Sequence, residues 1–144
     1  MRRMTRSERE TFLAEPRVAV LSVGGSGDRP PHSTPSFYAY EPGGDVTFFT
    51  NTEGRSARKV ALIADAGAVT LNVQEPEFPY MYVSVECRIV ATGRPDVGQV
   101  RTIASRYLPP EAAEGMAQAE AGDPGSTIVL YTARPERWLT ATFA

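Results

Sequence analysis

The sequence predicts a mainly β domain, a small antiparallel β-barrel with peripheral helices. Six runs have the alternation or the β-branched and aromatic content of strands. The turns between the first runs are rich in glycine and proline and too short for parallel crossovers. Helical patterns are inserted between the later strands. A length of 144 residues fits one domain, spanning residues 1–144, with a core of its own.

The first part of the chain is predicted to be one helix followed by an antiparallel meander. A helix is expected over residues 5–14, where Thr5 with Glu8, or Ser7 with Glu10, has the spacing of a capping box. Pro16 ends this helix, because the residue before a proline avoids the helical region. The three strands of the meander are expected over residues 18–23, 32–40 and 46–51, with turns at 24–28 and 41–45.

The second part is predicted to alternate between helices and strands. Ser56 is the expected N-cap of a helix over residues 56–66, and Gly67 is its expected stop. The remaining helices are expected over 96–107 and 110–121. The remaining strands are expected over 68–74, 80–90 and 126–132, the last extended over 137–143 after a kink at Pro135.

Composition narrows the classes of function. A net charge of −2 argues against nucleic acid as the main partner. No apolar run is long enough for a membrane span, and no signal peptide is evident at the N-terminus. Cys87 is the only cysteine, which favours a small core residue and a cytoplasmic location. His32 is the only histidine, so no metal site is expected, and it is interpreted as a surface or edge-strand residue.

The densest basic run outside the N-terminal tail contains the only lysine of the chain. Arg55, Ser56, Arg58 and Lys59 follow a predicted strand and open a predicted helix. A helix start offers free backbone N–H groups and the positive end of the macrodipole, so this run is a candidate phosphate site. A solvated helix face is the alternative, and Glu53 and Asp65 are near enough in sequence to neutralise part of the charge.

Aromatic and polar residues on the neighbouring strands are candidates for binding a flat ring. Without further context the pattern favours core residues, and Trp138 favours core or dimer packing. The candidates lie in residues 35–38, with Ser36 and Phe37, in residues 48–51, with Phe48, Phe49, Thr50 and Asn51, and at Gln74 and Trp138.

The order of these motifs resembles the pyridoxamine 5′-phosphate oxidase-like family of FMN- and deazaflavin-binding split β-barrels. The resemblance rests on the segments 17–21, 29–35, 46–50, 56–62 and 79–86. It implies a six-stranded antiparallel split barrel of the FMN-binding-protein type, and a homodimer with cofactor sites at the interface. The segment 79–86 looks closest to the subgroup that uses the deazaflavin coenzyme F420, whereas the C-terminal segment lacks the signature of the pyridoxamine phosphate oxidases proper.

The resemblance also implies roles for the candidate residues. Arg55, Ser56, Arg58 and Lys59 would bind the cofactor phosphate, and Ser36, Thr50, Asn51 and Gln74 would contact the ring or ribityl groups. Phe37, Tyr80 and Trp138 would pack the walls of the site. The expected activity is hydride transfer from reduced F420 to an electron-poor C=C or quinone-like bond. The alternatives are an FMN-dependent reductase or oxidase and a non-catalytic flavin carrier or sensor. The proton donor is Tyr38 or solvent.

Overall fold

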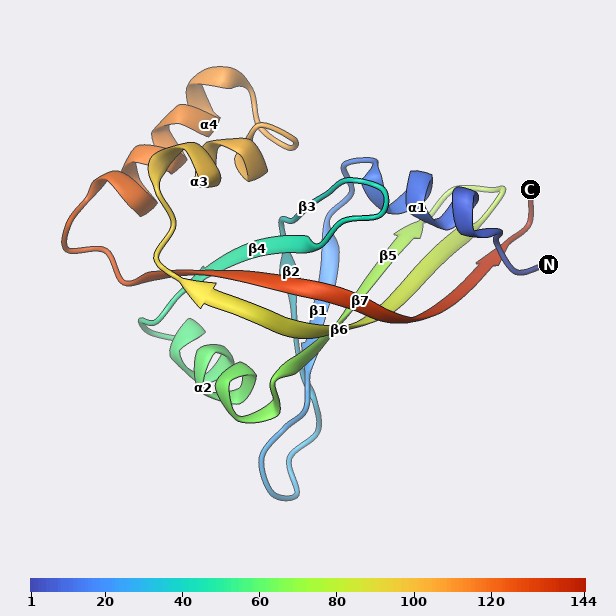
Figure 1. Cartoon of the computed structure of the whole chain (residues 1–144), viewed down its shortest axis with the longest axis horizontal. Coiled ribbons are helices and arrows are strands. Elements are labelled where there is room, and N and C mark those ends of the chain that lie inside the picture. The colour runs from blue at the N-terminus through green and yellow to red at the C-terminus, as the bar shows by residue number, and fades with distance from the viewer.

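The computed structural model describes all 144 residues as a curled antiparallel sheet with four α-helices around it (Figure 1). The strands are β1 (Ala19–Val23), β2 (His32–Ser36), β3 (Ala39–Tyr40), β4 (Val46–Asn51), β5 (Ala68–Glu75), β6 (Met81–Gly93) and β7 (Ile128–Thr142). The helices are α1 (Arg6–Ala14), α2 (Ser56–Ala66), α3 (Val97–Ala104) and α4 (Pro110–Ala117), with a π-helical turn over Gln118–Gly122. None of these helices is long and apolar enough to cross a membrane.

The sheet has seven strands in the order β2-β1-β5-β6-β7-β4-β3, and not the six that the sequence predicts. The difference arises within residues 32–40, which the sequence indicates as a single strand. His32–Ser36 pairs with β1, whereas Ala39 and Tyr40 pair with β4 at the opposite edge of the sheet. Phe37 and Tyr38 carry the chain from one edge to the other, so the sheet must curl into a half-barrel.

The two longest strands form the spine of the sheet. The segments 126–132 and 137–143 belong to one continuous strand, β7, and the expected kink at Pro135 is instead a local irregularity. Glu86 pairs with Arg137 while Cys87 pairs with Pro135, which leaves Glu136 as an extra residue on β7. Such a bulge bends and twists a strand without ending it.

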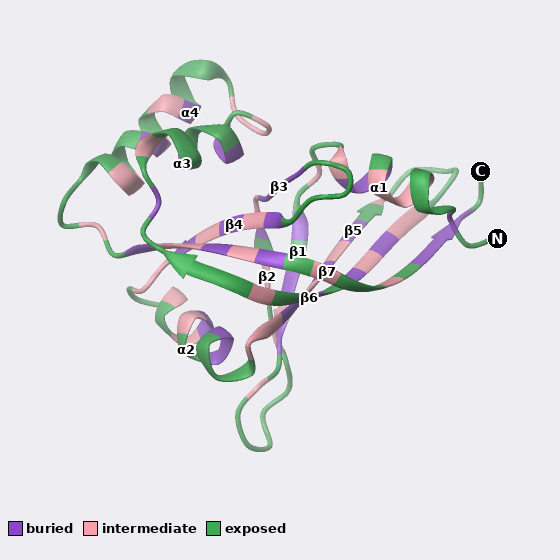
Figure 2. Cartoon of the chain, viewed as in Figure 1, coloured by how far each residue is buried: buried purple, intermediate pink, exposed green.

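The core lies inside the curl of the sheet, under α1 and α2. It contains 20 buried residues, including Phe48, Val73 and Leu13. Figure 2 shows the alternation of buried and exposed positions along the strands. Cys87 is only 2% exposed, and burial raises the pKa of its thiol to about 12, as befits a core residue.

The helices keep most of the expected boundaries. Thr5 caps α1, and its capping box uses Glu8. Gly67 ends α2 at a φ of 67°, a conformation that favours glycine. The expected N-cap of α2 is wrong by one residue: Arg55 occupies that position and its side chain makes no capping hydrogen bond. No side chain caps α2, and the N–H groups of Ser56 and Ala57 donate instead to the carbonyl oxygens of Glu53 and Gly54.

The helices α3 and α4 form a hairpin beside the sheet and pack on it through a small cluster of their own. Val100 and Ala117 join Ile128 of β7 there, and Phe49 and Met116 lie against them. Both helices stop earlier than predicted, α3 at Ala104 and α4 at Ala117, where a π-helical turn begins. This hairpin places Met116 close to the free edge of β4.

Candidate functional site

A pocket of about 250 Å³ lies where the sheet does not close. The strand β2 pairs only with β1, and β4 pairs with β3 only at Val46 and Thr47, so the rest of this edge of β4 is free. The walls of the pocket come from both free edges and from two helices. Its lining is Val18, Pro35, Ser36, Phe37, Phe49, Lys59 and Met116.

Lys59 forms the floor of this pocket. Its side chain is 7% exposed, and its Nζ donates a hydrogen bond of 3.3 Å to Oγ1 of Thr34 on β2. No carboxylate lies within 4.0 Å of Nζ. Burial lowers the pKa of the Lys59 ammonium, because a charge is costly away from water. The charge of Lys59 is therefore uncompensated, and a bound anion would neutralise it.

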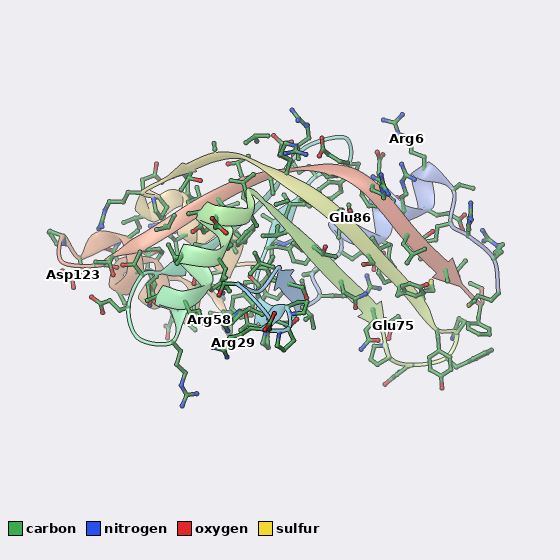
Figure 3. All side chains as sticks on the ribbon, turned by 90° about the horizontal axis from the view of Figure 1, so that it is seen from below. Arg6, Arg29, Arg58, Glu75, Glu86 and Asp123 are labelled. Carbon is green, nitrogen blue, oxygen red and sulfur yellow. The ribbon has the colours of Figure 1, made fainter.

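The same end of the molecule carries further cations without acidic partners. Arg55, Arg58 and Arg29 form no ion pair, and neither Glu53 nor Asp65 pairs with any base. Nη2 of Arg58 is buried without a hydrogen-bond partner. Figure 3 shows Arg58 and Arg29 on the same side of the molecule, with the labelled acids elsewhere. Of these cations Arg55 and Arg29 are exposed to solvent, Arg58 is half-buried, and only Lys59 is buried.

Phe37 is held in place by an aromatic stack that the sequence did not reveal. Its ring lies 4.3 Å from that of Tyr107, and the two planes differ by 4°. The Tyr107 hydroxyl donates to the carbonyl oxygens of Arg17 and Tyr38, at 2.9 and 3.1 Å. Tyr107 follows α3, so this stack ties the helical hairpin to the crossing between β2 and β3.

Two pocket residues, Val18 and Met116, were not among the candidates that the sequence indicates. Phe49 was among the candidates for binding a ring, and it lines the pocket from the face of β4 opposite the buried Phe48. Met116 had no local signal, because its place depends on how the helical hairpin folds back on the sheet.

The polar candidates on β4 have structural roles in the free protein. Thr50 is 7% exposed and shares the buried face of β4 with Phe48. Asn51 shares the opposite face with Phe49, and its Oδ1 accepts a hydrogen bond of 3.1 Å from the N–H of Glu53. Asn51 thus shapes the connection into α2. Contacts of either residue with a cofactor stay predictions.

The other candidates lie apart from this pocket within one chain. Gln74 and Tyr80 line a second hollow, of about 400 Å³, at the far end of β5 and β6. Trp138 packs edge-on against Tyr40, and the Arg9 guanidinium lies 4.6 Å from its ring centre. One chain therefore gathers Ser36, Phe37 and Lys59, but not Gln74, Tyr80 or Trp138.

Tyr38 is excluded as a proton donor in this conformation. Its side chain is fully buried, and its hydroxyl donates to the carbonyl oxygen of Leu13 at 2.7 Å. Burial is the main cause that raises the pKa of this phenol far above its usual range. The hydroxyl anchors the crossing segment to α1 and does not reach the pocket. Of the two donors considered from the sequence, solvent remains.

Comparison with known proteins places this arrangement in a known fold. No family model and no curated protein sequence matches the chain. Solved structures do match. An F420 reductase aligns with a TM-score of 0.67 at 21% identity, over 90% of this chain and 94% of its own. The chain has the fold of the pyridoxamine 5′-phosphate oxidase-like split barrels.

Two further split barrels support this assignment. An FAD-binding protein from Mesorhizobium loti aligns with a TM-score of 0.63 at 18% identity, over 96% of this chain and 93% of its own. A protein from Listeria innocua, provisionally named a pyridoxamine 5′-phosphate oxidase, aligns with a TM-score of 0.63 at 13% identity. The alignment covers 94% of this chain and 96% of the other. The fold expected from the motif order is confirmed, whereas identities this low leave the chemistry to be argued from the residues themselves.

Replacing Lys59 by Met should raise the stability of the free split barrel. Met keeps the length of the apolar stem and removes a buried charge that has no acidic partner. We expect the free energy of unfolding to rise by about 1 kcal/mol, measured by urea denaturation at neutral pH. Arg6→Met, at an exposed position, is the control and should stay within about 0.5 kcal/mol of the wild type. A clear loss of stability in Lys59→Met would mean that the ammonium serves the fold.

Proposed function

We propose that the chain is an oxidoreductase that binds a flavin or deazaflavin cofactor in the split between β2 and β4. The observation that carries this proposal is Lys59, a buried cation without an acidic partner at the floor of a pocket with aromatic walls. Natural proteins retain such a destabilising charge where function requires it. The fold of the F420 reductase and of the FAD-binding protein adds support.

The residues present fit the phosphate of such a cofactor. Lys59 and the orphaned Nη2 of Arg58 supply charge-assisted donors. The N–H groups of Ser56 and Ala57 already donate to Glu53 and Gly54, so the backbone donors left at the start of α2 are those of Arg58 and Lys59. Arg55 and Ser56 stand at that start and complete the proposed phosphate site. Ser36 would contact the polar edge of the ring, and Phe37 and Phe49 would pack against its faces. These side chains bind and orient, and the apolar walls exclude water from the bound ring.

The coenzyme we favour is F420, and when bound in its reduced form it would supply a hydride. The acceptor would be an electron-poor C=C or a quinone-like bond of a small molecule. The named F420 reductase of the same fold supports this choice. The pocket lining supports an acceptor with apolar faces, because Val18, Phe49 and Met116 surround the polar floor.

A homodimer would complete the site. The pocket of about 250 Å³ lies below the ~300–1,000 Å³ typical of ligand sites. Phe78, Tyr80 and Phe143 form an exposed aromatic cluster, with rings 5.7–6.3 Å apart, beside Gln74. We propose that a second copy brings this cluster over the pocket. Sedimentation should give the mass of a dimer, and a monomer at saturating cofactor would contradict the arrangement.

Two alternatives rest on specific observations. FMN would use the same phosphate site, and the FAD-binding protein of the same fold favours a flavin. A non-catalytic carrier or sensor is favoured by the absence of an acid–base residue in the pocket other than Lys59. Parallel fluorescence titrations of the purified protein with FMN and F420 separate the first alternative from our proposal.

Removing the two charges of the phosphate site should weaken cofactor binding. For Lys59→Met with Arg58→Gln we expect a loss of about 1.5–3 kcal/mol for each charged hydrogen bond, or roughly 10- to 150-fold in Kd per bond. Fluorescence titration measures the change. Arg101→Gln, on the exposed face of α3, is the matched control and should bind as the wild type does. Equal affinity in the double variant would refute the phosphate site.

Turnover should distinguish an enzyme from a carrier. We expect the protein to oxidise reduced F420 when a quinone or conjugated enone is added. The reaction is measured as the loss of the acceptor's absorbance. The double variant should lose this activity at cofactor concentrations that saturate the wild type. Tight cofactor binding with no oxidation across a panel of such acceptors would favour the carrier.

A further inference from the structure

His32 faces the proposed phosphate site from β2. Residues 32, 34 and 36 lie on one face of this strand, and Thr34 on that face accepts the hydrogen bond from Lys59. The Nδ1 of His32 is buried and has no hydrogen-bond partner. The edge-strand position expected from the sequence is confirmed, but one side of this imidazole is turned inward.

The charges around His32 are all positive. Arg58 and Lys59 act on it from α2, and Arg29 acts on it from the connection between β1 and β2. Its pairing partner on β1 is the apolar Val23. Asp28, the acid nearest in sequence, forms no ion pair and is not among the charges that act on the imidazole. Burial first, and then these three cations, lower the pKa of His32.

We propose that His32 is a member of the anion site, and that an anion bound between Lys59 and Arg58 is taken up together with one proton on His32. This inference rests on the proposed phosphate site and extends it to a residue outside the basic run. In the free protein, burial and the three neighbouring cations disfavour the charged form of His32. The negative charge of a bound phosphate or sulfate favours the protonated form of His32. The imidazolium can then donate a hydrogen bond to the anion or balance part of its charge.

The direction of the pH dependence follows from linkage. If the anion makes protonation of His32 easier, then protonation of His32 strengthens the anion's binding by the same factor. Affinity should therefore rise as the pH falls through the interval between the pKa of His32 in the free protein and its higher pKa in the complex. For one proton the slope is at most about tenfold in Kd per pH unit. Outside that interval His32 adds no pH dependence to the affinity for the anion.

The test uses the fact that this is the only histidine of the chain. Its ring protons give an unambiguous NMR signal, whose shift against pH reports the titration of His32 directly. Sulfate is the probe, because its own charge does not change near neutral pH. We expect saturating sulfate to move the midpoint of the titration to higher pH than sodium chloride of equal ionic strength, which controls for screening.

Two variants decide between specific and general effects. Lys59→Met should reduce the shift that sulfate causes in the titration midpoint of His32, whereas Arg101→Gln should leave that shift as in the wild type.

In a second experiment, the pH dependence of FMN binding is compared between the wild type and His32→Gln. The titration of the FMN phosphate is common to both, so the additional slope of the wild type belongs to His32.

The outcomes separate this inference from the proposed function. A midpoint that sulfate does not move, while FMN or F420 binds and Lys59→Met weakens it, refutes the role of His32 and leaves the phosphate site intact. A titration midpoint of His32 that is the same in sulfate as in sodium chloride of equal ionic strength also refutes the role of His32. If neither sulfate nor any cofactor binds, both the phosphate site and the role of His32 are wrong.

Discussion

The structure depends on the short crossing between β2 and β3. Two consecutive strands belong to opposite edges of one sheet, so the sheet must curl until those edges meet. Only two residues, Phe37 and Tyr38, span the distance. Tyr38 is buried and bonded to the end of α1, whereas Phe37 is stacked on Tyr107. One side chain thus anchors the crossing inside the core and the other presents a ring at the split.

The pocket is a direct consequence of that crossing. The crossing joins the two edge strands β2 and β3, and β3 pairs with only two residues of β4, which leaves the rest of that edge of β4 unpaired. The helix α2 closes the gap from below and inserts Lys59 into it. The helical hairpin closes it from the side with Met116. The split therefore has apolar walls and a cationic floor, and each part comes from a different segment of the chain.

The buried charge of Lys59 is unfavourable for the stability of the free protein. Its stem packs with Leu62 and Ile63 on the buried face of α2, yet its charged end has only the Thr34 hydroxyl as a partner. An apolar residue would suit this position better in the free protein. Arg58 on the same helix and His32 on β2 each keep a buried nitrogen without a hydrogen-bond partner. Buried polar atoms without partners are uncommon in folded proteins, so each of them calls for an explanation.

Local patterns in the sequence predicted most of the elements. The capping box at Thr5 and the glycine stop at Gly67 are short-range signals, and the structure confirms both. The division of residues 32–40 was missed, because nothing within that segment reveals that its halves pair with opposite edges. For the site, the basic run drew attention to Lys59, which lines the pocket, and its role in binding phosphate stays a prediction. Met116 and Tyr107 were missed because their contacts depend on the packing of the helical hairpin, and His32 was set aside because its sequence neighbours give no hint of α2.

The central claim is that an anionic group of the cofactor binds on Lys59 inside the split. A crystal structure of the protein grown with F420 or FMN tests it most directly. Our account predicts density for the phosphate within hydrogen-bonding distance of the Lys59 Nζ, and the ring between the free edges of β2 and β4. A cofactor bound elsewhere, with Lys59 still bonded only to Thr34, would contradict it.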